Sequence, residues 1–373
     1  GNVNYSNALK VNGSFGTASY LLTSQAGGVN TWTDPATLSS GLEFITEGAN
    51  SGWRFIGANA ANYGDIGANA VDLSYSSSAS TTYGATGNYS TAMGQNTTAS
   101  GSVSTAMGDN TTASGDGSTA MGNNTVATGI FSTAMGNTTN AEGNNSTAMG
   151  NNASAIGVAS TAMGENTTAS SDRSTAIGFG TTASGSNSTA MGESTNAIGT
   201  SSTAMGNNTT ASGNISTAIG NTTTASGEAS TAMGNQTTAL SHAETSIGTF
   251  NTTYTPFSTF AFNAADRLFT IGNGSALGSE SNALIIYKDG RMNINDAYTM
   301  PNVAGTANQI LQTDAGGNVS WFTIPALNTL YAADDALTSN RIVDHQNFSL
   351  NFQTTITNGF SVDGTTFSVD GAN

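Results

Sequence analysis

The sequence of 373 residues contains no cysteine, only four prolines and few charged side chains. Without cysteine, neither disulfides nor thiolate metal sites can hold the fold together. Asp, Glu, Lys and Arg make up 8% of the chain, where roughly 25% is usual. An enzyme of ordinary composition needs bulky apolar residues for its core and dense charge at its surface, so this composition argues against one.

Positive charge is especially scarce, and the net charge is −16. The seven cations are scattered, so we expect no basic face for nucleic acid; they are Lys10, Arg54, Arg173, Arg267, Lys288, Arg291 and Arg341. Apolar runs such as 283–287 fall far short of the roughly 18 residues that suggest a membrane-spanning helix. The chain begins at Gly1 without an apolar leader, which we interpret as a processed or excised segment.

Small residues fill most of the chain instead, and glycine alone accounts for 46 positions. Disordered chains pair low hydrophobicity with high charge and proline, whereas this one has little charge, four prolines and 36% apolar residues. Low complexity combined with order indicates an internal repeat.

The repeat has a period of 14 residues. Met or Ile recurs at this spacing from Met93 to Ile247, which defines twelve units between residues 87 and 254 without an insertion. The first unit reads GNYSTAMGQNTTAS. Its fifth position is Thr and its eighth position is Gly in all twelve units. Each unit therefore places the same side chain in the same environment.

Fourteen residues are too few for a helical-hairpin repeat, and glycine at this frequency destabilises helices. They suffice for two short strands, STAMG and TTAS, joined by tight turns rich in Gly and Asn. One unit therefore predicts one coil of a parallel β-solenoid, and twelve stacked coils predict a column about 57 Å long.

Strand alternation sorts the side chains of STAMG into two faces, with Thr and Met or Ile on one face and Ser, Ala and Gly on the other. We expect Met and Ile to lie inside the coil as a continuous apolar spine. The alanines, beginning with Ala92, Ala106 and Ala120, would then form a flat outer face that packs against another copy of the chain. Asn at the turns is expected to favour tight bends or stacked amide ladders.

These units resemble the head repeats of YadA-type trimeric autotransporter adhesins, with their Ser-x-Ala-Ile-Gly core and Ala-Ser-Gly step, over about 168 of the 373 residues. The resemblance implies a left-handed parallel β-roll, three parallel chains, and an elongated head displayed at a surface for adhesion. This sequence departs from the family in carrying Thr for a β-branched apolar residue and Met for Ile.

The flanks share a second pattern, since residues 16–32 align with residues 305–321 at a constant offset of 289. Each copy predicts a β-hairpin with an Ala-Gly-Gly turn and a Trp anchor. Together with residues 359–371, these hairpins resemble the shafts of tail-fibre-domain surface proteins of Bacteroidota and of bacteriophage fibres.

We therefore expect an all-β chain in which hairpin-rich fibrous modules flank the β-roll, assembled as a parallel homotrimer. A solenoid exposes unpaired strand groups at its ends and needs caps, for which aromatic residues such as Phe250, Tyr254, Phe257, Phe260 and Phe262 are available. The expected segments are a hairpin module (1–40), an entry cap (41–86), the roll (87–254), a cap and neck (255–300), a second hairpin module (301–328) and a β-rich shaft that continues beyond the chain (329–373).

Catalytic patterns find little support. His242 and His345 are the only histidines, and we expect both to be solvent-exposed. Two Gly-x-Gly-x-x-like stretches, 115–120 and 178–183, lie inside the repeat and are interpreted as coincidences. The acids of the roll fall singly at turn positions, where we expect them to serve solubility; they are Asp109, Asp116, Glu142, Glu165, Asp172, Glu193, Glu228 and Glu244. No catalytic, cofactor, metal or receptor-binding residue is assigned.

The sequence thus predicts a structural extracellular fibre without enzymatic activity or cofactors, on a bacterial cell surface, that attaches to a surface, glycan or host receptor. The alternative is a tail fibre of a bacteriophage or a contractile injection system, located on the virion or particle. A fibre that cleaves carbohydrate through paired carboxylates is a weaker hypothesis. Ice binding is weaker still, because Met or Ile stands two residues after each ladder threonine such as Thr91.

Overall fold

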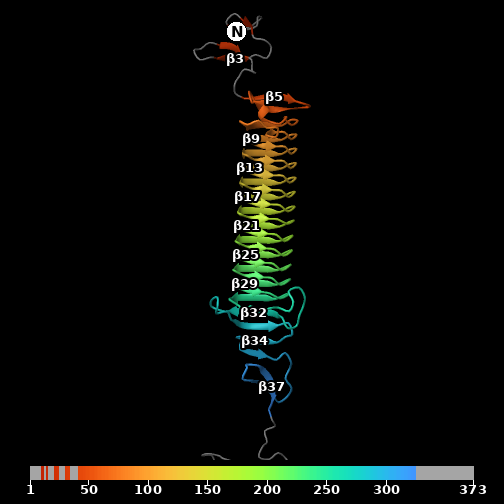
Figure 1. Ribbon diagram of the computed structural model, residues 1–373, viewed down its shortest axis with the longest axis vertical. Helices are drawn as coiled ribbons and strands as arrows, with labels where there is room; N and C mark the ends of the chain where they lie inside the picture. Colours follow the sequence, from red (N-terminus) through yellow and green to blue (C-terminus); the bar gives the residue numbers. More distant parts are fainter. Residues whose placement is uncertain (1–9, 12–13, 16–20, 25–29, 34–40, 325–373) are drawn as a thin grey trace, which may run out of the picture.

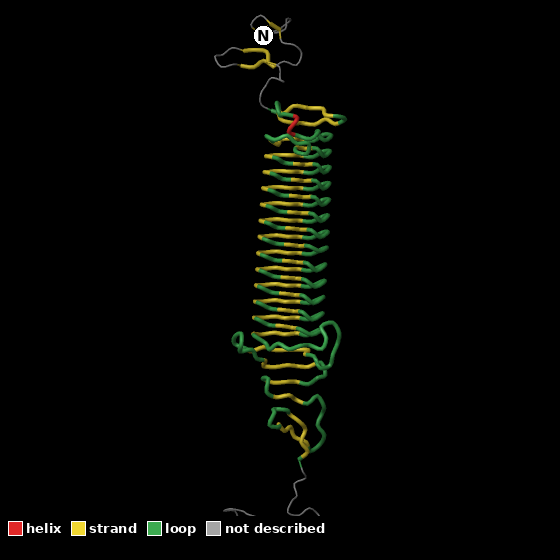
Figure 2. The backbone as a smooth tube through the Cα atoms, in the orientation of Figure 1, coloured by secondary structure: helices red, strands yellow, loops and turns green. Residues whose placement is uncertain are grey.

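The computed structural model describes residues 10–11, 14–15, 21–24, 30–33 and 41–324. Regular structure in these ranges is β-strand apart from one short 3-10 helix, η2 (Ala60–Asn62). Residues 41–324 form a long column whose middle part consists of regularly stacked coils (Figure 1; Figure 2). No helix in the described ranges is long and apolar enough to cross a bilayer. The predicted all-β solenoid is confirmed.

Each coil contributes one strand to each of two parallel sheets. The first sheet contains five-residue strands: β9 (Thr91–Gln95), β11 (Thr105–Asp109), β13 (Thr119–Asn123), β15 (Thr133–Asn137), β17 (Thr147–Asn151), β19 (Thr161–Glu165), β21 (Thr175–Phe179), β23 (Thr189–Glu193), β25 (Thr203–Asn207), β27 (Thr217–Asn221), β29 (Thr231–Asn235) and β31 (Thr245–Thr249).

The second sheet contains two-residue strands: β8 (Gly84–Ala85), β10 (Thr98–Ala99), β12 (Thr112–Ala113), β14 (Val126–Ala127), β16 (Asn140–Ala141), β18 (Ser154–Ala155), β20 (Thr168–Ala169), β22 (Thr182–Ala183), β24 (Asn196–Ala197), β26 (Thr210–Ala211), β28 (Thr224–Ala225) and β30 (Thr238–Ala239). In both sheets of the repeat, strands pair in parallel with a shift of 14 residues. Met121, for example, pairs with Met135. Like side chains therefore stack above like along the column.

The interior of the coil is made of small side chains. Ser and Ala of the long strand segment and Thr and Ala of the short one point inward and are almost completely buried, as in Ser146, Ala148, Thr139 and Ala141. Met and Ile point outward instead, so their predicted inward placement was wrong, and so was the outer face of alanines. The prediction that Thr and Met or Ile share one face of the strand was correct. Met and Ile cannot be inside, because the long and the short strand segment of each coil lie too close together to leave space for them.

The glycine at the eighth position of each unit has a steric reason. At Gly150 the backbone has a φ of +125°, and a Cβ atom would lie 2.0 Å from the carbonyl oxygen of Gly164 in the next coil. A side chain there would strain its own backbone and collide with the neighbouring strand. The invariance of this position across the twelve units follows from the close stacking.

The turns continue the ladder from one coil to the next. The third position of each unit has a left-handed backbone even where it carries a bulky residue, as at Phe131 (φ 55°) and Ile215 (φ 58°). The Phe131 N–H donates to the Asp116 carbonyl of the previous coil at 2.8 Å. Stacking thus imposes a conformation that these residues disfavour by themselves.

The first sheet changes from parallel to antiparallel pairing beyond each end of the repeat. At the N-terminal end, β7 (Val71–Tyr75) pairs in parallel with β9, and β6 (Asn50–Phe55) in parallel with β7 before forming a hairpin with β5 (Leu42–Glu47). At the C-terminal end, β32 (Arg267–Asn273) pairs in parallel with β31, and β33 (Asn282–Tyr287), β34 (Met292–Ile294) and β35 (Tyr298–Met300) follow in antiparallel order.

The two related flanking segments form hairpins with the same register. In β3 (Leu21–Ser24) and β4 (Asn30–Thr33), Leu22 pairs with Trp32; in β36 (Gln309–Thr313) and β37 (Val319–Thr323), Leu311 pairs with Trp321. A further short pair joins β1 (Lys10–Val11) and β2 (Ser14–Phe15). The segment boundaries remain predictions, and the proposed shaft (329–373), including residues 359–371, lies outside the described residues.

Ala148 and Met149 are neighbours on β17 and distinguish the two faces. We expect Ala148→Leu to destabilise the solenoid by about 1–3 kcal/mol, because the larger side chain has no space between the flanking Ala134 and Ala162. Met149→Leu should have a much smaller effect. Thermal unfolding followed by circular dichroism, with hydrogen exchange at β17, measures both variants. Equal losses would contradict the inward placement of alanine.

Candidate functional site: the outward face and the ends of the solenoid

The five-residue strands present one continuous outward face with two columns of side chains. The first strand residue is Thr and the third is Met or Ile, and in every coil both are in part accessible. Met107 and Met233 expose 37% and 44% of their surface. These columns are therefore neither core nor ordinary polar surface, and an apolar stripe follows the long axis.

At the N-terminal end, the two columns become aromatic. Trp53 extends the Thr column through its pairing with Val71, and Phe44 pairs with Trp53 one strand further out. The Phe44 and Trp53 rings pack edge to face with 5.2 Å between their centroids. Both rings remain about half exposed, at 58% and 44%. The stripe thus ends in a large apolar patch on the β5–β6 hairpin.

At the C-terminal end, the columns continue without a break. Phe269 pairs with Thr245 and Ile271 with Ile247, and the column partners on β33 are Ile286 and Leu284. The apolar character of the face therefore runs over the whole sheet from β5 to β35.

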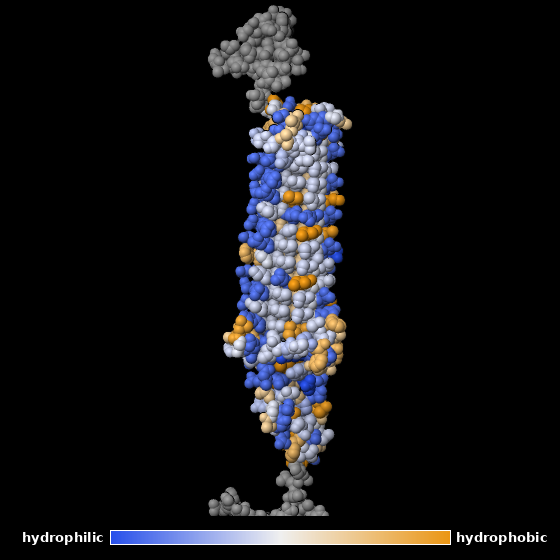
Figure 3. Space-filling view, viewed as in Figure 1, coloured by the Kyte–Doolittle hydropathy of each residue, from blue (hydrophilic) through white to orange (hydrophobic). Residues whose placement is uncertain are grey.

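Polar side chains gather along the edges of the column, where the turns lie (Figure 3). One edge carries stacked amides, as predicted: Asn137 donates to Asn151 at 2.9 Å, and Asn152 to Asn166 at 2.8 Å. On the opposite edge, the Asp172 carboxylate accepts the Val158 N–H of the previous coil at 3.0 Å. These side chains link successive coils in addition to the backbone ladder.

Charge is buried where the solenoid begins. Arg54 is 3% exposed, and its guanidinium contacts Asp72 at 3.1 Å and Glu47 at 2.7 Å. The same guanidinium donates to the Gly64 carbonyl at 3.0 Å and lies 4.8 Å from the centroid of the Tyr63 ring. This cluster joins the hairpin, the following loop and β7, so it closes the N-terminal end.

A second buried cluster closes the C-terminal end. Glu244 takes the place of the repeat serine and accepts the N–H groups of Leu240 and Ser241, each at 2.9 Å. It also lies 3.1 Å from the Tyr254 hydroxyl, and the Arg267 guanidinium lies 4.3 Å from that ring. Burial raises the pKa of Tyr254 far above its ordinary value, so its hydroxyl stays protonated.

Lys288 completes this cluster by donating to the Ser241 hydroxyl at 2.9 Å. Burial lowers the pKa of Lys288, and the nearby carboxylates of Asp266 and Glu244 oppose that change. Asp266 in turn accepts the N–H of Phe257 at 2.7 Å.

The comparison with protein families identifies the repeat. The YadA head domain repeat matches residues 85–102, 104–125, 127–153, 155–181, 183–209, 197–223 and 211–237. YadA head repeats are thus detected over residues 85–237. The matched residues are those that form the regular coils of the column. Comparison with curated proteins finds no match to the chain.

Six of the eight acids of the 14-residue units are exposed, as expected for a role in solubility. Three of them, Asp109, Glu165 and Glu193, end strands β11, β19 and β23, so their predicted turn positions were wrong. Glu228 is half-buried at its turn, and Glu244 is completely buried in the C-terminal cluster, so the predicted exposure of Glu244 was wrong. The reason is that the last coil must satisfy strand groups that no further coil covers. Sequence alone offered one signal, the replacement of the repeat serine by Glu244.

The two histidines do not form a site in the described structure. His242 is half-buried at the turn before β31, which corrects its predicted exposure, and His345 lies outside the described residues. The cations are less scattered than their sequence positions indicate, because Arg54 and Arg267 are both buried at the ends. Among the described residues, no group of three or more acidic or imidazole side chains could hold a metal ion.

Next to the C-terminal cluster, a loop carries three exposed aromatic side chains. Phe257, Phe260 and Phe262 expose between 68% and 76% of their surface. The loop is fixed to the last YadA coils, since the Glu228 N–H donates to the Thr259 carbonyl at 2.7 Å. Sequence reasoning expected these aromatics to cap the solenoid, but the buried charged cluster closes it and the rings point outward.

We expect Asp72→Ala to open the N-terminal end, because it removes the carboxylate that the buried Arg54 guanidinium contacts. Breaking a buried pair on one side typically costs about 3–5 kcal/mol. Hydrogen exchange should therefore accelerate in β5–β7, whereas β17–β25 stay protected, since repeats depend chiefly on their neighbours. The control is Asp116→Ala at an exposed turn. Unchanged exchange in β5–β7 would contradict a closing role for Asp72.

Proposed function

We propose that the chain is part of a trimeric adhesin displayed on the outside of a bacterial cell, with the solenoid as its elongated head. The YadA head repeats support this assignment, because the family resemblance implies three parallel chains and attachment to a surface. The proposal gives the chain a structural and binding role and no chemical step. The face described above supplies the observation on which the proposal depends.

That observation is the half-exposed apolar stripe from β5 to β35. Contiguous exposed apolar surface in a soluble protein marks an interaction site. The stripe follows the column axis, and its residues repeat at every coil, so parallel copies can meet in register along the whole length. We place the three-fold axis along this face, with the Thr and Met or Ile columns of each chain directed toward it.

Met149→Glu tests the trimer and this choice of face together. We expect the variant to dissociate, because stacking three buried carboxylates at one level near the axis is strongly unfavourable. The coil itself should stay folded, since Met149 is not part of its interior. Native mass spectrometry gives the oligomeric state, and circular dichroism gives the fold.

The matched control is Asn137→Glu on the neighbouring strand β15, at a position where other coils already carry Glu165 and Glu193. Its ladder partners, Asn123 and Asn151, are uncharged. This variant should remain trimeric. A wild-type chain that is a monomer would overturn the trimer, and a trimeric Met149→Glu variant would overturn the choice of face.

Adhesion is tested directly with beads that carry the full chain. We expect such beads to be retained under flow on host-cell or glycan-coated surfaces, and beads that carry the Met149→Glu variant to be retained less, because loss of the trimer removes multivalent binding. Beads coated with an unrelated protein of similar charge are the control. Failure of the wild-type beads on every surface would contradict an adhesive function.

The repeated hairpins favour a second candidate, a tail fibre of a bacteriophage or contractile injection system. Their common register, with a Leu–Trp pair in each copy, resembles the fibrous modules expected from the sequence of such proteins. Immunogold labelling of the producing culture distinguishes the candidates. Gold on the cell envelope supports the adhesin, and gold on particle tails supports the fibre.

A further inference from the structure

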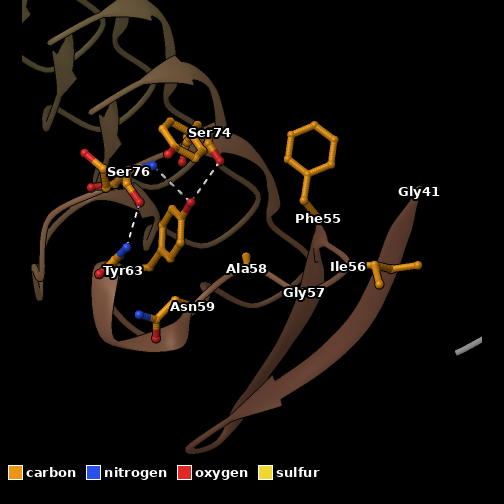
Figure 4. Close-up of a pocket in the computed structure, with 12 residues that line it drawn as sticks. Gly41, Phe55, Ile56, Gly57, Ala58, Asn59, Tyr63, Ser74 and Ser76 are labelled. Atoms are coloured by element: carbon orange, nitrogen blue, oxygen red, sulfur yellow. Dashed lines mark hydrogen bonds between the residues drawn. The ribbon is translucent and has the colours of Figure 1, made fainter. Parts of the chain in front are cut away.

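A cavity of about 670 Å³ opens where the N-terminal cap meets the first coils. Its wall consists of the end of β6, the loop that follows it and the end of β7. In Figure 4, Phe55 stands on one side, Tyr63, Ser74 and Ser76 on the other, and the loop with Ala58 and Asn59 between them. The volume lies within the roughly 300–1,000 Å³ typical of small-molecule sites.

The lining contains no charged residue, although the chain carries a net charge of −16. It is made of glycine, alanine, isoleucine, amide, hydroxyl and aromatic side chains: Gly41, Phe55, Ile56, Gly57, Ala58, Asn59, Asn62, Tyr63, Ser74, Tyr75, Ser76 and Ser77. The buried Arg54 is paired with Glu47 and Asp72, and none of these three charged side chains lines the cavity. A charged ligand would find no counterion here, so the cavity suits an uncharged one.

The polar groups of the lining still offer donors and acceptors. Asn59 uses its side-chain oxygen for the Ala61 N–H, and Asn62 uses its amide nitrogen for the Ser76 carbonyl at 2.7 Å. Among the described residues, the Asn59 nitrogen, the Asn62 oxygen and the Ser77 hydroxyl have no protein partner. These atoms can donate to and accept from the hydroxyl groups of a ligand.

One aromatic ring adds apolar contact surface outside the Thr and Met columns. Tyr75 lines the cavity, pairs with Gln95 at the end of β9, and exposes 63% of its surface. Phe55 also lines the cavity but lies on the outward face of β6 with Trp53, toward the proposed three-fold axis. A ligand with both an apolar face and many hydroxyl groups would use the Tyr75 ring and the amides together.

The wall is already rigid before a ligand arrives. The Tyr63 hydroxyl accepts the Ser76 N–H at 3.1 Å and donates to the Ser74 carbonyl at 3.2 Å (Figure 4). Beneath it, the Arg54 guanidinium lies against the Tyr63 ring. A preorganised wall lowers the entropic cost of binding.

We propose that this cavity binds an uncharged saccharide, whose C–H face would stack on Tyr75 while its hydroxyl groups bond to the Asn59 and Asn62 amides and the Ser77 hydroxyl. The inference rests on the proposed adhesive function, for which it supplies the class of receptor. It also places recognition at one end of the head, away from the stacked coils.

The experiment uses the full chain on an array of neutral hexose and N-acetylhexosamine oligosaccharides, printed beside sialylated and sulfated counterparts. We expect binding to neutral members, and a loss of roughly tenfold in affinity for Tyr75→Ala through the lost stacking. Tyr75→Trp, which keeps an aromatic ring, should retain binding. The fold of each variant is checked by circular dichroism.

The matched control is Tyr89→Ala. Tyr89 is as exposed as Tyr75, at 62%, but lies in a turn of the first coil outside the cavity, and other coils carry Ala at this position. Its substitution should leave sugar binding unchanged. Absence of binding to every neutral sugar, preference for the anionic ones, or equal loss in both alanine variants would overturn the proposal.

Bead adhesion separates this proposal from the general one. If beads with the wild-type chain attach and beads with Tyr75→Ala attach equally well, the adhesive function stands and the saccharide site fails. If wild-type beads attach nowhere but the array shows Tyr75-dependent binding, the site stands and the adhesive function fails.

Discussion

The thin interior of the coil is the constraint on which the rest of this structure depends. Two strand segments of one coil face each other so closely that only Ser, Ala and Thr fit between them. Burying such small groups contributes little apolar free energy per coil, because the hydrophobic effect scales with buried area. Stability must therefore come largely from the contacts between coils, through the backbone ladder and the stacked side chains.

The same constraint explains the composition. Low charge avoids ladders of like charge at a spacing of one strand, and glycine at the eighth position lets successive backbones approach. Bulky residues are confined to the outside, where Phe131 and Ile215 stand at left-handed turn positions. A composition that resembles disorder in bulk is, in this geometry, what close stacking requires.

The period, the strands, the turns and the amide ladders could be predicted from sequence because each depends on local chemistry repeated twelve times. The choice of the inward face could not, because alternation states which side chains share a face and leaves open which face is inside. Whether Ala148 or Met149 lies inside the coil is decided by the distance between the two sheets. No local sequence pattern gives that distance. The charged clusters at the two ends could not be predicted for a related reason. Arg54, Asp72 and Glu47 come together only when the N-terminal cap folds, and because this cap occurs once, no repeated sequence pattern marks its residues.

Placing the apolar columns outside changes what the ends of the solenoid must do. The backbone groups of regular coils pair with those of their neighbours, whereas the first and last coils face loops and hairpins of irregular shape. Buried ion pairs and hydrogen-bonded carboxylates suit such junctions because each of these contacts is directional and holds a few individual groups in place. They do not need the extended, regular surface on which strand pairing depends. Glu244 shows this directly, since one substitution in the repeat pattern binds two N–H groups that another coil would otherwise cover. At the N-terminal end the corresponding cluster also supports the wall of the cavity through Tyr63, so the requirement to close the column and the capacity to bind a ligand arise from the same residues.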